Sequence, residues 1–431
     1  MRHSLAPRKR VFAMAGLMSL VGTAVALIAL VTWLTLGDAA PIDPGLTAQA
    51  ASAAAIERGA YLARAGNCRA CHTVAGGAAF AGGVRIDTPF GAVVAPNITP
   101  DLRTGIGPWS AADFWRALHH GRGKNGRLLN PAFPYPSFTY VTREDSDALY
   151  AYLRSVPAVE RPNDPSALRF PFNTQAALAL WRALYFRPGE LRPQPGQSTE
   201  WNRGRYLVLG LGHCSACHSE RDALGGIHAE AEFAGGLMPD SKWYAPSLSS
   251  PGEAGVQAWP RNRVARLLKV GAADGATASG PMAEVVYAST QHLDDADLEA
   301  IASYLAWIPA RDTERHDENQ RASSDVMLRG GNVYSTHCAA CHGKQGKGID
   351  GIYPALAGNR AVTLARPNNL VQIIRHGGFA PTTAGNPRPF GMPPLGQVLD
   401  DDEIAAVSTF IRQSWGNSAN PVTPLQVLHV R

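Results

Sequence analysis

The chain has 431 residues and a formal net charge of +5, with 40 Lys and Arg against 35 Asp and Glu. Four positive charges precede a long apolar run, at Arg2, Arg8, Lys9 and Arg10, so the remainder is nearly neutral. It therefore lacks the basic footprint of a nucleic-acid-binding protein. A chain of this length is expected to form roughly two to four domains.

The first predicted element is an apolar segment in which no charged residue occurs from Val11 to Leu36. A membrane-spanning helix needs about 20 residues, whereas the apolar core of a signal peptide has about 7–15. The length favours a retained anchor over a cleaved signal peptide, although Ala48-Gln49-Ala50 offers a cleavage site further on. In either case the basic flank stays in the cytoplasm, and the rest of the chain is expected on the periplasmic side of a bacterial inner membrane.

A C-x-x-C-H motif follows at Cys68-Arg69-Ala70-Cys71-His72. Two thiols three residues apart share one face of a helical turn, so both can reach the vinyl groups at one edge of a porphyrin. The next His can then bind the iron as proximal ligand. The motif recurs twice, so that all six cysteines belong to it; the other members are Cys214, Cys217 and His218, and Cys338, Cys341 and His342. This pattern predicts three covalently bound haem c groups rather than a zinc site, a thioredoxin-like pair or a disulfide framework.

Each motif lies between two expected helices. An Arg-Gly pair precedes it, at Arg58-Gly59, Arg203-Gly204 and Arg329-Gly330. A helix with an acidic start follows it, at 144–155, 294–307 and 400–415. Acidic residues in a first turn suit the helix dipole, and apolar positions spaced by three and four give one buried face. The predicted fold class is mainly α, with three tandem cytochrome c-like domains after an N-terminal membrane anchor or signal segment.

This organisation predicts a set of boundaries along the chain. The expected segments are a basic flank with the anchor or signal at 1–37, a spacer at 38–54, domains at 55–157, 201–309 and 325–416, an inter-domain segment at 158–200, a linker at 310–324 and a tail at 417–431. The inter-domain segment contains a helical patch at 174–185 and is expected to pack between domains. The linker is polar and is expected to be a flexible joint.

A six-coordinate haem iron needs a second axial ligand, most often a Met sulfur, which raises the reduction potential. We expect Met392 in the third unit, because it lies 50 residues past His342 and just before the closing helix. Met282, 64 residues past His218, is expected in the second, whereas Met238 lies too early and too near a turn. For each methionine the alternative role is packing in the core.

The first unit contains no methionine, and Phe133 stands at the corresponding position. Phenylalanine cannot ligate iron. His119 or His120 could supply a second imidazole, but His120-Gly121 corresponds to His376-Gly377 of the third unit, which favours a structural histidine. An open or water-bound iron is the other alternative. Proximal histidines usually donate their second ring nitrogen to a carbonyl, and loop residues around Pro96, Pro246 and Pro354 are candidates.

The residues resemble the triheme cytochrome c subunits of bacterial membrane-bound dehydrogenases. The segments that carry this resemblance are NITPD (97–101), PAFPYPSF (131–138), WNRGRYLVLGLGHCSACH (201–218), PMAEVVYASTQHLDDADL (281–298) and SWGNSANPVT (414–423). The resemblance implies a chain with no catalytic residues of its own. Such a chain takes electrons from a quinoprotein, flavin or molybdenum dehydrogenase subunit and passes them towards ubiquinone or a terminal oxidase. Phe133 departs from the alcohol-dehydrogenase branch and leans towards the molybdenum branch.

Two other functions remain open at this point. A haem enzyme that acts on peroxide through an open first iron would explain the missing methionine. A haem subunit of a respiratory oxidase would share the motifs but should purify with a copper–haem core instead of a dehydrogenase.

Overall fold

The computed structural model describes Gly22, Ala29 and residues 52–239, 242–311 and 320–430. The expected anchor or signal segment, its alternative cleavage site and most of the 310–324 joint lie outside these residues. Over the described part of the chain, no helix combines the length and apolar character needed to cross a membrane.

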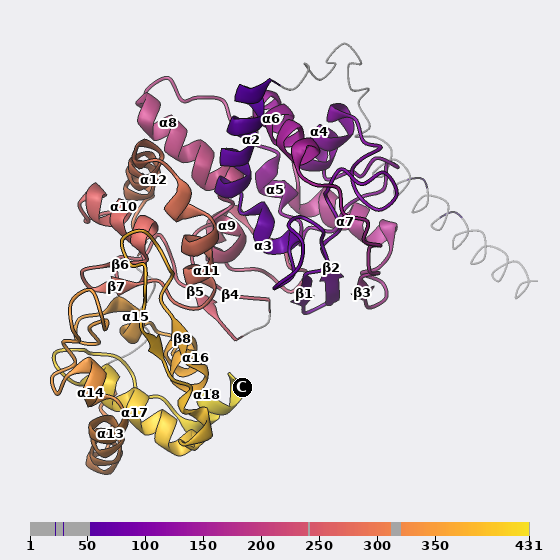
Figure 1. Cartoon of the computed structure of the whole chain (residues 1–431). Coiled ribbons are helices and arrows are strands. Elements are labelled where there is room, and N and C mark those ends of the chain that lie inside the picture. Colours follow the sequence, from indigo (N-terminus) through magenta and orange to yellow (C-terminus); the bar gives the residue numbers. More distant parts are fainter. Residues whose placement is uncertain (1–21, 23–28, 30–51, 240–241, 312–319, 431) are drawn as a thin grey trace, which may run out of the picture.

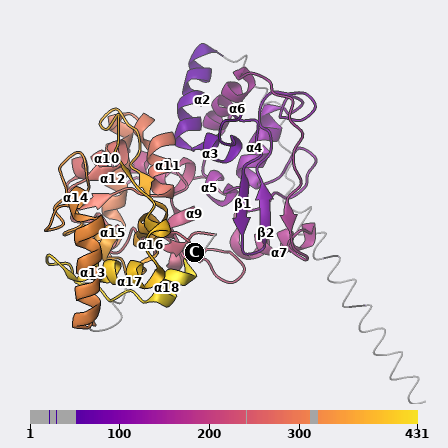
Figure 2. The ribbon, with the colours of Figure 1, turned by 60° about the horizontal axis from the view of Figure 1, so that its bottom comes forward.

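The fold is mainly helical, as predicted, and contains three similar helical units (Figure 1). The first unit contains α2 (Ala53–Ala65), α3 (Cys68–His72), α4 (Ala111–His120), α5 (Tyr135–Phe138) and α6 (Arg143–Ser155). The second contains α8 (Thr199–Tyr206), a π-helical turn (Leu207–Leu211), α9 (Ser215–His218), α10 (Arg261–Val270), α11 (Pro281–Ala288) and α12 (Asp295–Trp307). The third contains α13 (Ser324–His337), α14 (Ala339–His342), α15 (Arg360–Thr363), α16 (Asn368–His376), α17 (Asp401–Gln413) and α18 (Pro424–His429). The first and third units lie at opposite sides of the molecule in both ribbon views (Figure 2).

The strands are short and all their pairings are antiparallel. In the first unit β1 (Arg85–Thr88), β2 (Gly91–Val94) and β3 (Ala167–Leu168) form a sheet in that order. The remaining strands form two-residue hairpins: β4 (Gly236–Leu237) with β5 (Tyr244–Ala245), β6 (Ala272–Ala273) with β7 (Ala276–Thr277), and β8 (Gly378–Phe379) with β9 (Gly391–Met392). The β6–β7 hairpin follows α10, and the β8–β9 hairpin follows α16.

In every unit the opening helix crosses the closing helix at the glycine of the Arg-Gly pair. A Cβ atom at Gly59 would lie inside van der Waals contact of the Ala148 carbonyl oxygen, and one at Gly204 would meet that of Ala300. Gly330 and Ala406 repeat the contact in the third unit. Glycine is therefore required because the two helix backbones approach closely here. The repeated pair seen in the sequence marks the centre of each unit.

The closing helices begin within one residue of the starts that their acidic residues predicted. Asp294 and Asp400 are N-caps whose carboxylates accept the backbone N–H three residues on, as the Thr142 hydroxyl does at α6. Side-chain acceptors of this kind satisfy donors that the first helical turn leaves free. The third helix ends at Gln413 rather than at Trp415, which has a left-handed φ of +56° and packs against Tyr334.

The segment between the first and second units packs against both, as expected. Its helix α7 (Gln175–Tyr185) starts at the N-cap Thr174. A guanidinium N–H of Arg182 donates to the His120 carbonyl of the first unit, at 2.7 Å. Tyr185 donates to Asp222 of the second unit, at 2.6 Å. The segment therefore connects the first unit to the second through hydrogen bonds to both.

Candidate haem sites

Each C-x-x-C-H motif forms a short helix directly after the opening helix of its unit. Eleven residues separate Arg203 from Cys214, whereas ten separate Arg58 from Cys68. The π-helical turn at Leu207–Leu211 accommodates the additional residue. Asn67 and His213, just before the motifs, both adopt left-handed φ angles, so the first and second motifs are presented in the same way.

The cysteines are in an environment opposite to that of a reactive redox pair. Burial raises the pKa of Cys68 and of Cys214 to about 12, and that of Cys338 to about 11. Catalytic C-x-x-C thiols have lowered pKa values, because the thiolate is the reactive form. These thiols stay protonated and face apolar space, as expected of positions that carry an apolar group through thioether bonds.

The three motif histidines are anchored in the same way, and this confirms the carbonyl partners proposed from the sequence. The Nδ1–H of His72 donates to the Pro96 carbonyl at 2.7 Å, and that of His218 to Pro246 at 2.7 Å. His342 donates to Pro354 at 3.0 Å. Because a carbonyl only accepts, the proton is on Nδ1 and Nε2 keeps its lone pair. Burial also lowers the pKa of each ring, which favours the neutral imidazole that binds a metal.

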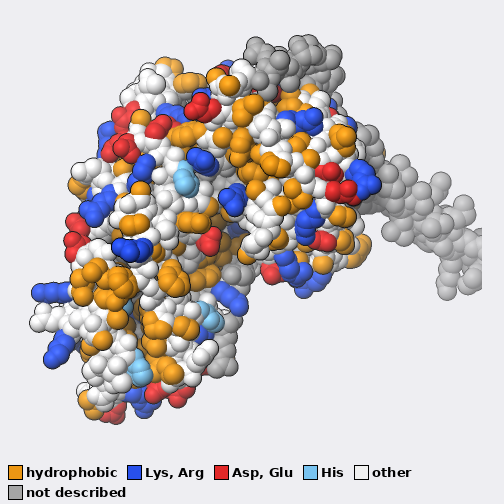
Figure 3. Space-filling view, viewed as in Figure 1, with side chains coloured by type: hydrophobic (Ala, Val, Ile, Leu, Met, Phe, Trp, Pro, Cys, Tyr) orange, Lys and Arg blue, Asp and Glu red, His pale blue; other side chains and the backbone are white. Residues whose placement is uncertain are grey.

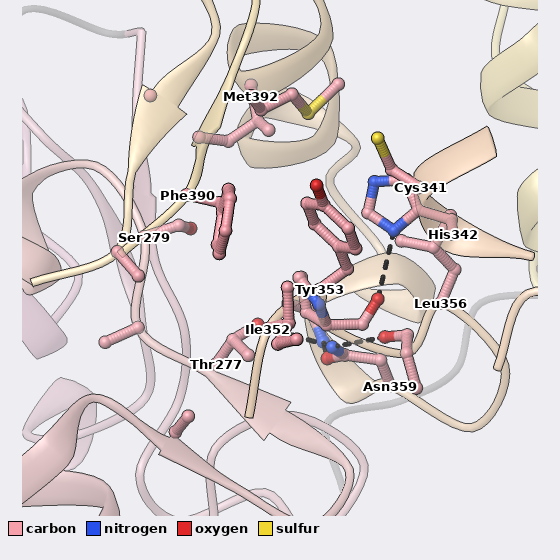
Figure 4. Close-up of a pocket in the computed structure, with 18 of the residues that line it drawn as sticks. Thr277, Ser279, Cys341, His342, Ile352, Tyr353, Leu356, Asn359, Phe390 and Met392 are labelled. Carbon is pink, nitrogen blue, oxygen red and sulfur yellow. Dashed lines mark hydrogen bonds between the residues drawn. The ribbon is translucent and has the colours of Figure 1, made fainter. Parts of the chain in front are cut away.

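The third unit contains a cavity of about 540 Å³. Cys338, Cys341, His342 and Met392 all line it, so the structure brings the four predicted site residues of this unit together. The Met392 thioether and the His342 imidazole face the same space, with Tyr353 and Phe390 as aromatic walls (Figure 4). A volume of about 300–1,000 Å³ is typical of sites for organic cofactors.

The second unit contains a cavity of about 290 Å³ lined by Cys214, Cys217, His218 and Met282. Met238 lines it as well, which the sequence analysis did not expect because this residue precedes a turn. The structure therefore offers two thioethers on one cavity.

Three stacked side chains cover part of the second cavity. Trp259 lies between two guanidinium groups, with the Arg263 carbon 3.7 Å and the Arg360 carbon 4.5 Å from its ring centroid. Trp259 and Arg360 line the cavity. Sequence analysis missed this group because Arg360 comes from the third unit.

In the first unit Phe133 packs against the same core cluster as Cys68, Leu118 and Phe138. Met392 likewise packs against the core cluster of its unit, which contains Cys338. His119 stacks on Trp115, and their ring centroids are 4.2 Å apart.

The first and second units exchange hydrogen bonds reciprocally. Arg58 pairs with Asp145 within the first unit, and Arg203 pairs with Asp297 within the second. Each aspartate then accepts a hydroxyl from the other unit: Tyr206 donates to Asp145 at 2.6 Å, and Tyr61 donates to Asp297 at 2.7 Å. Each tyrosine follows its own arginine by three residues, and each aspartate is the third residue of its closing helix. The two units are thus related by an approximate twofold axis.

The repeated RGAY and RGRY sequences were the signal that could have identified these tyrosines. In the third unit the corresponding residue is Asn332, so the exchange involves the first two units alone.

The first two motifs are close in space, and the second and third cavities share lining residues. The Cys71 thiol is close enough to Cys217 for an electrostatic effect on its pKa. The hairpin of β6 and β7 supplies residues to both the second and the third cavity, as does Asn369. The Asn369 amide also donates to the Tyr244 carbonyl and accepts from the Tyr244 N–H, at 2.8 and 2.9 Å. The sites therefore form a row that passes from the first unit through the second to the third.

These features fit covalent haem. Among the described residues, no group of three or more His, Cys, Asp and Glu side chains could hold a lone metal ion. Thiols paired at a spacing of three residues, a neutral imidazole with its second nitrogen fixed, and apolar cavity walls suit a porphyrin instead. On the face in view, acidic and basic side chains are interspersed and form no single-sign field (Figure 3).

Known proteins share these features. The chain matches the family described as "Cytochrome c" over residues 56–157, 203–309 and 327–415. It is 39% identical to the cytochrome c subunit of alcohol dehydrogenase (quinone) from Gluconacetobacter polyoxogenes, over 88% of this chain and 85% of that protein. It is 39% identical to the gluconate 2-dehydrogenase cytochrome c subunit of Pantoea cypripedii, over 88% and 90%. The fructose dehydrogenase cytochrome subunit of Gluconobacter japonicus is 35% identical, over 91% and 85%.

Proposed function

Because the chain belongs to the cytochrome c family, we propose that it is the electron-carrying subunit of a membrane-bound dehydrogenase. In this role it accepts electrons from a catalytic partner and passes them towards ubiquinone or a terminal oxidase. The observation that carries the proposal is the match of nearly the whole chain to such subunits, together with three C-x-x-C-H motifs whose histidines are anchored alike.

The chain carries three covalently bound haem c groups. Each haem supplies a one-electron iron couple when bound. We assign Cys68 and Cys71, Cys214 and Cys217, and Cys338 and Cys341 to thioether attachment. We assign His72, His218 and His342 as the first ligands of the three haem irons. We assign Met282 and Met392 as the second ligands in the second and third units.

The order of the sites supports a linear route. The first and second motifs approach each other through Cys71 and Cys217, and the second and third cavities share a wall. Buried surroundings limit the reorganisation of solvent when charge moves, and the fixed rings of the motif histidines hold each haem in place. The chain itself performs no substrate chemistry in this scheme.

The two other functions are not favoured. The relatives that match most of this chain are named as dehydrogenase cytochrome subunits, and neither a peroxidase nor an oxidase subunit is among those described above. The kind of dehydrogenase partner, whether a quinoprotein, a flavin enzyme or a molybdenum enzyme, is defined by the catalytic subunit that purifies with this chain.

The proposal is tested by purifying the chain from membranes with and without its catalytic partner. We expect substrate to reduce all three haems only when the partner is present. Turnover of an alcohol, aldehyde or sugar by the isolated chain would contradict the assignment. Mass spectrometry should find three added porphyrin masses on the exported chain.

The periplasmic location and the inner-membrane anchor belong to the same proposal and rest on the apolar run from Val11 to Leu36. We expect the mature chain to retain this run. An intact mass that matches a chain cleaved just after Ala50 would instead show that this segment is a signal peptide.

A further inference from the structure

The first unit differs from the other two at the position opposite its motif histidine. In each unit the central helix ends at a glycine with a left-handed φ: Gly121 after α4, Gly271 after α10 and Gly377 after α16. The chain that follows brings Met282 and Met392 to their cavities, and it brings Phe133 to the core beside Cys68. A phenyl ring has no lone pair to donate to iron.

No other sulfur ligand is available in this unit, because residues 52–200 contain no methionine and both cysteines belong to the haem motif. His213 packs on Phe138 of the first unit, but it lines the cavity of the second unit and its Nδ1 donates to the Leu211 carbonyl. Within the first unit itself the remaining candidates are the two histidines at the end of α4, and their direction on the helix bears on how the first iron is coordinated.

His119 points away from the haem side of α4. Phe114 and Leu118 pack into the core clusters that include Cys68, and so define the inner face of the helix. At 3.6 residues per turn, His119 lies about 100° beyond Leu118, on the face of Trp115. It stacks on that indole and is 8% exposed. This histidine has a structural role.

His120 lies one residue further round the helix, and its ring stands edge-on to His119 with centroids 4.7 Å apart. Its carbonyl accepts from Arg182, which fixes the end of α4 against α7. The turn at Gly121 is closed by the Tyr135 ring, which a Cβ at this glycine would strike. To reach the iron, His120 would have to break this packing.

We propose that the first haem site keeps no protein ligand opposite His72 and is a binding site for a small exogenous ligand. The ligand class is carbon monoxide or nitric oxide for the reduced haem, and cyanide or azide for the oxidised haem. The ligand donates one lone pair to the open position, and nothing is oxidised, reduced or deprotonated. Phe133 is only partly buried. The inference rests on the haem attachment proposed above.

The test is a pair of reciprocal substitutions in the full-length, haem-loaded chain. We expect the reduced wild-type protein to bind one carbon monoxide per three haems, with one high-spin haem in the resting spectrum. Phe133→Met should bind none and become low-spin throughout. Met392→Phe serves as the matched control and should bind two carbon monoxide molecules.

Haem content keeps the outcomes distinct. Mass spectrometry should show three porphyrins on every variant, so a loss of haem attachment cannot be mistaken for a change of ligand. A wild-type protein with three haems, all low-spin and indifferent to carbon monoxide, would overturn the inference. It would also be overturned if His119→Ala, His120→Ala or His213→Ala alone created the high-spin signal, because that histidine would then be the ligand.

Discussion

Two methionines line the second cavity with His218, and only one sulfur can bind opposite that ring. Met282 is the second residue of the eight-residue helix α11, whereas Met238 follows the two-residue strand β4. A ligand must be held in place by its own backbone, and α11 supplies the firmer support. Met282 is therefore the better candidate.

We expect Met282→Ala to shift the spectrum of one haem and to lower its reduction potential, because the soft thioether favours reduced iron. Met238→Ala should leave both unchanged and acts as the control. Spectra and a redox titration of the two variants decide the assignment. A shift in the Met238 variant with none in the Met282 variant would reverse it.

Asp297 gives the contact between the first two units a pH dependence. Burial alone would raise the pKa of this carboxyl, but hydrogen bonds from Arg203 and Tyr61 outweigh it and hold the pKa below its ordinary value of 3.8. Because the folded-state pKa is the lower one, the carboxylate stabilises the fold above about pH 4. That stabilisation is lost as the pH falls through the folded-state pKa.

We therefore expect wild-type unfolding midpoints to fall more steeply below pH 4 than those of Asp297→Asn. At pH 7 the variant should be less stable by about 1.5–3 kcal/mol, the range for hydrogen bonds to charged groups. Urea unfolding followed between pH 3 and pH 7 measures both effects. Parallel pH profiles for the two proteins would contradict the assignment.

At the scale of elements, the crossing of opening and closing helices organises every unit. The sequence predicted these helices and their starts to within about one residue, because capping by residues such as Asp294 is a local signal. It did not explain why glycine follows arginine. That reason is a contact between backbones far apart in the chain, which no local pattern encodes.

Adding a methyl group at a crossing should force the two helices apart. We expect Gly59→Ala, Gly204→Ala and Gly330→Ala each to destabilise its own unit by about 1–3 kcal/mol, as overpacking does. Gly196→Ala is the control, because a Cβ there meets no atom within 4 Å. Thermal unfolding followed by the spectrum of each haem would locate the damage. Equal stability of the crossing variants and the control would be evidence against the close approach.

At the scale of the whole molecule, the sequence predicted three haem units from the spacing of the C-x-x-C-H motif. It predicted the carbonyl partners of their histidines from the prolines in the loops that follow each motif. It could not predict how the units meet. The Tyr61–Asp297 contact joins residues 236 positions apart, and the Trp259 stack draws Arg360 from another unit. Such contacts depend on the assembled surface, where several pairings are chemically equivalent.

We expect removal of both exchanged hydroxyls, in Tyr61→Phe with Tyr206→Phe, to loosen the first two units without loss of haem. The magnetic interaction between their oxidised haems, measured by electron paramagnetic resonance, should weaken. Tyr150→Phe is the control, because its hydroxyl donates within the first unit, to Trp109. An unaltered interaction in the double variant would mean that other contacts fix the distance.

The reciprocal hydrogen bonds between the first two units also limit how many units this kind of contact can join. An isologous interface is satisfied by two copies and leaves no free half for another. A duplicated gene segment could therefore have produced one such couple, but adding a further copy required a different face, as the Asn369–Tyr244 contact illustrates. Repetition of this one contact therefore cannot join more than two units, and the third unit meets the second through different residues.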